Sequence, residues 1–221
     1  MGEMPMPGGW TMSMMWMRMP GQTWPGAAAA FLASWIVMTA AMMLPVLVPA
    51  LRRYRGAVGA AAGARLGWST AIVGAGYFVV WSAFGLAVYP LGAGVAALAM
   101  REPSLSRAVP AAIGVVVLIA GAVQFTAWKV RQVRCCEDLP AHADGAWRLG
   151  LRLGRQCVRC CANLMAILLV AGVMDLGAMA AVTAAIVIER VAPGGRRGAR
   201  AVGFAAIAAA VLFLARAAAH E

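Results

Sequence analysis

The chain has 221 residues, of which 63% are hydrophobic and only 12% are charged, and its formal net charge is +11. A soluble domain carries about a quarter charged residues, so this composition excludes an ordinary water-soluble protein. The arginines lie between apolar runs, which indicates membrane topology and contact with the anionic headgroups of a lipid bilayer, not binding to nucleic acid.

Five apolar stretches are long enough to cross a membrane, because about 20 helical residues span a hydrocarbon core of ~30 Å. Backbone polar groups in lipid must be satisfied within the segment, so these stretches are predicted to be α-helices. In chain order they cover residues 27–50, 68–89, 108–128, 161–188 and 201–215. We therefore predict an all-α, polytopic integral membrane protein with about five transmembrane helices in one bundle over residues 27–217, preceded by a Met/Trp-rich outer segment, residues 1–26.

The ends of the predicted spans follow from prolines and turn residues. Pro90 is expected to stop the second span, and residues 90–100 are apolar but too short to cross, which favours a position at the interface. Residues 129–160 are predicted to form a loop, because Pro140 and Gly145 interrupt any continuous helix there.

Orientation is predicted from the distribution of lysine and arginine. With the N-terminus outside, the inner loops carry eleven positive residues and the outer segments carry seven. This excess favours an outer N-terminus and a cytoplasmic 129–160 loop, although the arginines of residues 190–200 argue for the opposite orientation.

Five cysteines form two tight groups, Cys135-Cys136 and Cys157-x-x-Cys160-Cys161. On a helix the last three lie at i, i+3 and i+4 and therefore face one side. Such thiolates in a reducing compartment favour a soft metal ion, Cu(I) first and zinc as the alternative, and the first pair can complete the ligand set. Two other interpretations stay open: small apolar side chains that pack helix ends, and thiol–disulfide exchange.

Methionine is concentrated at the N-terminus, where eight of the 15 methionines occupy the first 19 residues. Thioethers are neutral at any pH and bind Cu(I), so this outer segment predicts a capture site for the metal. The same mixture of Met and Trp also suits an interfacial membrane anchor. The candidate ligands are Met12, Met14, Met15, Met17 and Met19.

Inside the predicted spans, Met38 and Met42 share one face of the first helix at i and i+4. Asp175 lies in the middle of the predicted fourth span, where a carboxylate is costly and indicates function by default. On a continuous helix Asp175 would lie on nearly the same side as Cys161 and provide a charged step on a metal path. Its alternative role is a hydrogen bond to a neighbouring helix, for example to Gln124.

Several segments, in this order, carry a family resemblance. They are Trp35-x-x-Met38 with Ala41-Met42-Met43-Leu44-Pro45, Tyr77-Phe78-Val79-Val80-Trp81, Gln124-Phe125-Thr126-Ala127-Trp128-Lys129 with Cys135-Cys136, and Cys157-x-x-Cys160-Cys161 with Gly172-Val173-Met174-Asp175 and Glu189-Arg190. The chain resembles a bacterial family described as predicted metal-binding integral membrane proteins (domain of unknown function 2182). The resemblance implies a multi-pass protein of the bacterial cytoplasmic (inner) membrane that is suspected of metal binding, sometimes loosely labelled a copper chaperone.

The sequence offers few residues for enzymatic catalysis. No Gly-rich phosphate loop, zinc-protease motif or Ser/His/Asp set is readable, and there are only two histidines, so we expect no enzyme. We expect a membrane protein that binds Cu(I) for transfer across or along the membrane. The alternatives are a non-catalytic accessory subunit of a membrane metalloenzyme, with a membrane protein partner or a second copy of this chain beside it, and a thiol-redox membrane protein.

Overall fold

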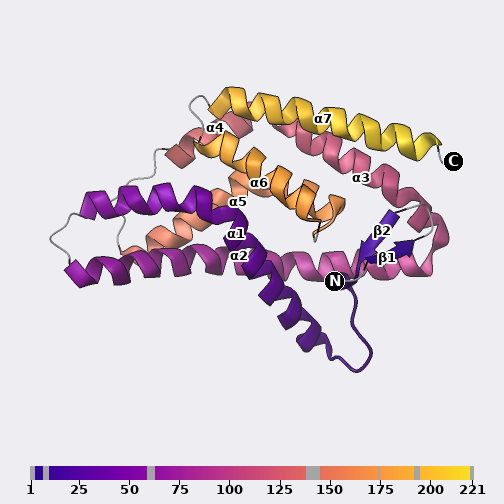
Figure 1. The fold of residues 1–221 in the computed structure, drawn as a ribbon, viewed down its shortest axis with the longest axis horizontal. Helices are drawn as coiled ribbons and strands as arrows, with labels where there is room; N and C mark the ends of the chain where they lie inside the picture. Colours follow the sequence, from indigo (N-terminus) through magenta and orange to yellow (C-terminus); the bar gives the residue numbers. More distant parts are fainter. Residues whose placement is uncertain are drawn as a thin grey trace.

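The computed structural model of the chain describes residues 3–6, 10–58, 63–137, 145–173, 175–191 and 195–219. This part of the chain forms seven α-helices, a two-stranded β-hairpin and one 3-10 turn (Figure 1). The helices are α1 (Trp24–Val58), α2 (Gly63–Arg101), α3 (Pro103–Val123), α4 (Ala127–Glu137), α5 (Ala146–Ala171), α6 (Leu176–Val191) and α7 (Gly195–Ala219).

Five of these helices, α1, α2, α3, α5 and α7, are long and apolar enough to cross a membrane. The shorter α4 and α6, with 11 and 16 residues, are not among these candidate spans. At 1.5 Å per residue, α6 is only ~24 Å long, which is less than the hydrocarbon thickness. The prediction of an all-α, polytopic membrane protein with about five spans is therefore confirmed.

Helix α1 contains Pro45 and Pro49 and bends in its middle, as Figure 1 shows. A proline inside a helix has no N–H to donate to the carbonyl four residues earlier, and its ring clashes with that carbonyl. Such prolines are the usual cause of a sharp kink. Met42 and Met43 lie on the turn of α1 that precedes Pro45.

The predicted end of the second span at Pro90 is wrong. Helix α2 continues through Pro90 to Arg101, so residues 90–100 are part of the same long helix and not a separate interfacial segment. Prolines are tolerated inside transmembrane helices because neighbouring helices and local adjustments satisfy the freed backbone groups.

The predicted fourth span, residues 161–188, is also wrong, because it is two helices. Helix α5 ends at Ala171, Gly172 adopts a φ of 130°, and α6 begins at Leu176. A φ in that region is readily available only to glycine, so Gly172 is the residue that allows the chain to leave the helix. The two helices pack against each other as an antiparallel hairpin, and Asp175 lies at its turn.

The segment predicted as a 129–160 loop is largely helical. Helix α4 occupies its beginning, and α5 starts at Ala146 directly after Gly145. The start of α5 is amphipathic: it buries Leu149 and Leu153, and the opposite side exposes its arginines. The prediction of a loop relied on the turn residues Pro140 and Gly145, and it missed this helix because only one face of the helix is apolar. Its cytoplasmic position stays a prediction.

The α5–α6 hairpin changes the charge argument for orientation. Lys129, just past the end of α3, forms an ion pair with Glu189 near the end of α6, so the 190–200 arginines lie at the same end of the bundle as Lys129. Helix α7 then runs back along α3, with Gly203 beside Gln124 and Leu214 beside Gly114. The arginines that argued against an outer N-terminus therefore join the predicted inner side, and the positive-inside argument becomes more consistent.

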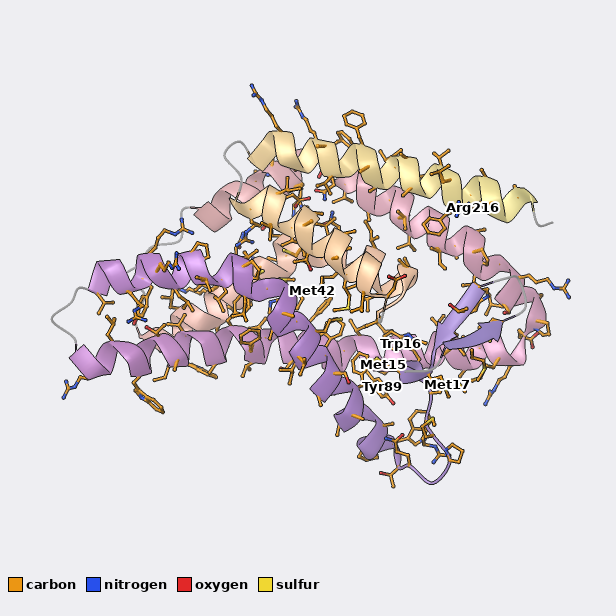
Figure 2. All side chains as sticks on the ribbon, in the orientation of Figure 1. Met15, Trp16, Met17, Met42, Tyr89 and Arg216 are labelled. Atoms are coloured by element: carbon orange, nitrogen blue, oxygen red, sulfur yellow. The ribbon has the colours of Figure 1, made fainter. Side chains whose placement is uncertain are left out.

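The N-terminal segment, predicted only as a Met/Trp-rich outer region, contains β1 (Glu3–Met6) and β2 (Trp10–Ser13), followed by the 3-10 turn η1 (Met14–Trp16). The hairpin docks where α2 meets α3, because the Trp10 indole N–H donates to the carbonyl oxygen of Ser106 at 2.9 Å. Figure 2 shows Met15 and Trp16 beside Tyr89, next to the N-terminal half of α1. The Trp16 ring lies 5.2 Å from that of Phe31, which anchors the segment to the bundle.

Candidate metal site

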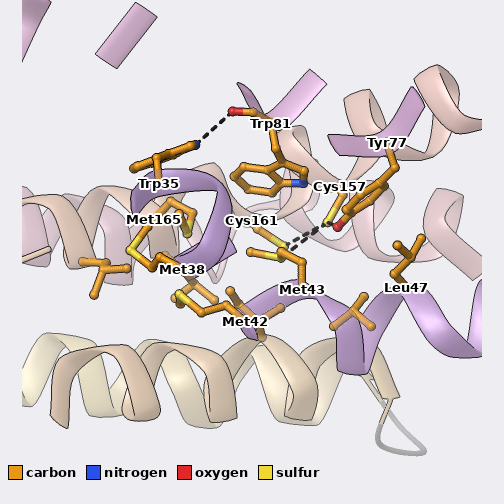
Figure 3. Close-up of a cluster of buried hydrophobic side chains, with 14 of the residues drawn as sticks. Trp35, Met38, Met42, Met43, Leu47, Tyr77, Trp81, Cys157, Cys161 and Met165 are labelled. Carbon is orange, nitrogen blue, oxygen red and sulfur yellow. Dashed lines mark hydrogen bonds between the residues drawn. The ribbon is translucent and has the colours of Figure 1, made fainter. Parts of the chain in front are cut away.

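Three sulfur atoms meet in the buried core between α1, α2 and α5 (Figure 3). The Sγ of Cys157 lies 3.9 Å from the Sγ of Cys161 and 3.9 Å from the Sδ of Met43. The three side chains are 1%, 1% and 0% exposed, and both cysteines are free thiols. We call Met43, Cys157 and Cys161 the sulfur site.

Two local features of the sequence create this arrangement. Cys157 and Cys161 are four residues apart on α5, so their side chains lie one turn apart on the same face. Met43 comes from α1, two residues before Pro45, and its thioether accepts a hydrogen bond from the Cys157 thiol. The sequence predicted the cysteine pairing, but Met43 was not among the candidate ligands because its contact depends on how two helices pack.

Glycines allow α2 to approach α5 closely enough to add a hydroxyl group to the site. A Cβ at Gly150 would lie 2.3 Å from the Val73 carbonyl oxygen, and one at Gly154 would lie 2.9 Å from the Tyr77 carbonyl oxygen. Small residues at such i, i+4 positions are the usual means of close helix packing in membranes. The Tyr77 hydroxyl consequently donates a hydrogen bond of 3.0 Å to the Sγ of Cys157. The Gly150-x-x-x-Gly154 motif was a readable signal for this contact.

Further thioethers line the same core. Met38, Met42 and Met165 are 4%, 2% and 0% exposed and belong to the same hydrophobic cluster as the cysteines. Figure 3 shows their side chains beside the sulfur site. Met38 and Met42 thus face the protein interior, in agreement with the shared face that the sequence predicted for them, and Met165 was missed.

Aromatic rings complete the surroundings of the site. The Trp35 indole N–H donates to the Trp81 carbonyl oxygen at 3.0 Å, and this bond fixes α1 against α2. The rings of Phe31, Trp35 and Phe84 follow one another at centroid distances of 5.7 and 6.1 Å. Phe31 and Trp35 belong to the same apolar cluster as the three sulfur atoms, and Phe84 packs against it.

A buried ion pair lies next to Cys160. The Lys129 ammonium group is 2.7 Å from the Glu189 carboxylate and donates to the Cys160 carbonyl oxygen, also at 2.7 Å. Gln124 donates to the other carboxylate oxygen of Glu189 at 2.5 Å, and Asn163 accepts from Lys129 at 3.2 Å. The network therefore connects the end of α3 and the start of α4 to α5 and α6.

This ion pair is fully enclosed, with the side chains of Lys129 and Glu189 0% and 1% exposed. Sequence reasoning treated Lys129 only as a topology signal, although an ionisable group next to an apolar span is a functional candidate by default. It also proposed Gln124 as a partner for Asp175. In the structure Gln124 bonds to Glu189 instead.

Asp175 occupies a different position from the one predicted. It is exposed, and its carboxylate accepts a hydrogen bond of 2.9 Å from the backbone N–H of Ala178, so it caps the N-terminus of α6. Cys161 and Asp175 do not share one side of a continuous helix, as the sequence predicted, because the helix ends between them at Gly172.

Most of the remaining candidate ligands lie away from the sulfur site. The side chains of Cys135 and Cys136 lie outside the described residues. Cys160 is the exception: it is buried on α5 one position before Cys161 and interacts electrostatically with it. Of the N-terminal methionines, Met12 is 3% exposed and Met19 is 48% exposed, and Met14, Met15 and Met17 are half-buried. Within the described part of the chain, no three His, Cys, Asp or Glu side chains form a metal-binding group. The cluster that does form has two cysteines and one methionine.

A set of two thiols and a thioether is chemically specific. Soft thiolate and thioether sulfur favours Cu(I), whereas magnesium and calcium need oxygen ligands. The chain matches the model of the family described as "PpoB2: Copper chaperone" over residues 32–213, which is most of its length. The chain belongs to this copper chaperone family. No curated protein and no solved structure matches it.

The matched region of this copper chaperone family member includes all three residues of the sulfur site and the Lys129–Glu189 pair. It does not include the N-terminal hairpin, residues 3–13. The family match and the sulfur donors of the buried site both point to copper, and they are independent observations.

Proposed function

We propose that this membrane protein binds one Cu(I) ion at Cys157, Cys161 and Met43 and passes it across or along the bacterial cytoplasmic membrane. The observation that supports the proposal is that the Sγ of Cys157 lies 3.9 Å from both the Sδ of Met43 and the Sγ of Cys161 within a buried, apolar core. The distances are short enough that small side-chain rotations would bring all three sulfur atoms onto one ion. The family match supports copper as the metal.

The charge of the proposed complex is compatible with Cu(I). Binding Cu(I) to two thiols releases two protons and leaves a complex of two thiolates and one cation, with a net charge of −1. A positive side chain next to it stabilises this complex in a low-dielectric core. The Arg190 guanidinium is close enough to interact electrostatically with Cys157, whereas the charge of Lys129 is already balanced by Glu189.

Zinc prefers four ligands in a tetrahedral arrangement, whereas this cluster offers two thiolates and one weakly binding thioether. The Tyr77 hydroxyl adds a hydrogen bond that stabilises a thiolate at Cys157. Both features fit a Cu(I) ion of low coordination number that is bound in transit.

Binding is tested with purified, reduced protein in detergent under anaerobic conditions. Cu(I) is titrated against a chromophoric Cu(I) chelator, and X-ray absorption then identifies the ligand atoms. We expect about one Cu(I) per chain with an all-sulfur ligand shell. The Cys157→Ser/Cys161→Ser variant should lose this ion, and Met43→Leu should bind it more weakly.

Matched controls separate the sulfur site from general effects. Met100→Leu changes an exposed methionine on α2 and should leave binding unchanged. Cys135→Ser/Cys136→Ser tests whether the first cysteine pair contributes a ligand. Full stoichiometry in the Cys157→Ser/Cys161→Ser variant would refute the proposal. A Cys157–Cys161 disulfide in acid-quenched cells, together with no copper binding, would favour the thiol-redox alternative.

A further inference from the structure

The N-terminal hairpin has an ordered face of soft donors that lies outside the region matched by the family. Strands β1 and β2 pair antiparallel with Met4 opposite Met12 and Met6 opposite Trp10. Directly paired residues project from the same side of a sheet, and so do residues two apart on one strand. Three thioethers and one indole ring therefore share a single face of the hairpin.

This face is turned toward the helices. Along β2 the exposure alternates: Met12 is 3% exposed, whereas its neighbour Thr11, on the other face, is exposed. Trp10 is held in place because its indole N–H donates to the Ser106 carbonyl oxygen at the start of α3. The thioethers are consequently preorganised and partly shielded from water, and are not mobile side chains of a disordered tail.

We infer that the face formed by Met4, Met6, Met12 and Trp10 is a second binding site for a soft monovalent cation, Cu(I) in the cell. Three thioethers supply the ligands, and the Trp10 ring can stabilise the cation through its π face. All four groups are neutral, so binding releases no proton and needs no reduced thiol. Of the five N-terminal methionines that the sequence favoured as ligands, only Met12 belongs to this face.

The segment that follows the hairpin packs against the apolar cluster that contains the sulfur site. Met15 and Trp16, which follow the hairpin directly, pack against the same hydrophobic cluster that contains Cys157 and Cys161. Trp16 also packs against Gly92 of α2, where a Cβ would lie 2.2 Å from the Trp16 ring. That the hairpin captures copper for the sulfur site rests on the proposed function. Metal binding by the hairpin itself does not depend on that function.

Binding is tested with Ag(I), which has the same charge and softness as Cu(I) and is stable in air. A chain with all five cysteines replaced by serine is titrated by calorimetry at pH 5 and at pH 7. We expect about one Ag(I) to remain bound, with less than a threefold change in affinity between the two pH values, because thioethers do not titrate. The Met4→Leu/Met6→Leu/Met12→Leu variant should lose this ion.

A matched triple variant, Met14→Leu/Met17→Leu/Met19→Leu, should keep it, because these methionines do not lie on the hairpin face. Should the serine background fail to fold, methyl NMR of [13C-methyl]methionine in the unmodified chain gives the same answer: the Met4, Met6 and Met12 signals should shift with Ag(I).

Equal binding by the two triple variants, or unshifted signals, would overturn the inference. The two proposals can be refuted independently, because loss of metal binding at the hairpin would leave the ion bound by the cysteines of the unmodified chain in place.

Discussion

Replacing Tyr77 by Phe removes one hydroxyl group from the sulfur site and leaves the packed ring in place. The lost hydrogen bond, 3.0 Å from the hydroxyl to the Sγ of Cys157, is accepted by a neutral thiol without metal and by a thiolate in the proposed Cu(I) complex. A hydrogen bond to a neutral group contributes about 0.5–1.5 kcal/mol and one to a charged group about 1.5–3 kcal/mol. The difference of about 1–1.5 kcal/mol should weaken Cu(I) binding about 5- to 13-fold.

The assay is competition with the chromophoric chelator, which reads affinity directly. Tyr89→Phe is the matched control, because Tyr89 is also buried but its hydroxyl has no hydrogen-bond partner in the described part of the chain. It should bind Cu(I) as the unmodified protein does. If Tyr77→Phe binds with unchanged affinity, or if both variants lose affinity equally, the Tyr77 hydroxyl does not support the metal complex.

Three further changes test the fold around the site. Gly150→Ala places a Cβ 2.3 Å from the Val73 carbonyl oxygen, so α2 must move away from α5; we expect about 1–3 kcal/mol of destabilisation in thermal unfolding and weaker Cu(I) binding. Lys129→Met leaves the buried Glu189 carboxylate without its ion pair and should destabilise the protein by about 3–5 kcal/mol, measured in the same way. Asp175→Ala removes the cap of α6 and should cost about 0.5–2 kcal/mol in the same assay, whereas Asp175→Asn keeps an acceptor oxygen and should cost little.

Each of these has an outcome that contradicts it. Gly74→Ala, where a Cβ meets nothing within 4 Å, is the control for Gly150→Ala, and equal destabilisation by both would exclude a specific contact. Adding Glu189→Gln to Lys129→Met should recover much of the lost stability, and no recovery would show that the ion pair is not the cause. Because Asp175→Asn keeps the cap, a loss of copper-dependent growth in that variant alone would restore the transport role that the sequence suggested for the charge.

The membrane-spanning architecture could be predicted because it depends on composition over long windows. Apolar runs near 20 residues allow few alternatives in lipid, so the number of spans followed from length and hydropathy. Boundaries were less certain, because Pro90 stays inside α2 and the arginine-rich start of α5 is helical. Both errors came from rules for soluble helices, in which proline and charge end a segment more readily.

The candidate site was predictable only in part. The i and i+4 spacing gave Cys157 and Cys161 from the sequence, because that relation lies within one helix. Met43 and Tyr77 reach the cysteines only through the packing of α1 and α2 against α5, which no local spacing reveals. Asp175 was misplaced for a related reason: a single glycine, Gly172, ends the helix on which its predicted position depended.

The two proposed sites differ in charge, and that difference would give copper transfer a direction. A Cu(I) ion among the neutral donors of the hairpin keeps a charge of +1, whereas the same ion between Cys157 and Cys161 replaces two protons and forms a complex of charge −1. Movement from the hairpin to the sulfur site therefore releases two protons, and by mass action a tenfold fall in proton concentration favours the sulfur site about a hundredfold, or about 2.7 kcal/mol. In the chain with both sites intact, Cu(I) should accordingly occupy the hairpin near pH 5 and the sulfur site near pH 8, which X-ray absorption can follow as a change from thioether to thiolate ligands. If the ligand shell is the same at both pH values, Cu(I) does not pass between the two sites in response to pH, and the hairpin does not deliver copper to the sulfur site.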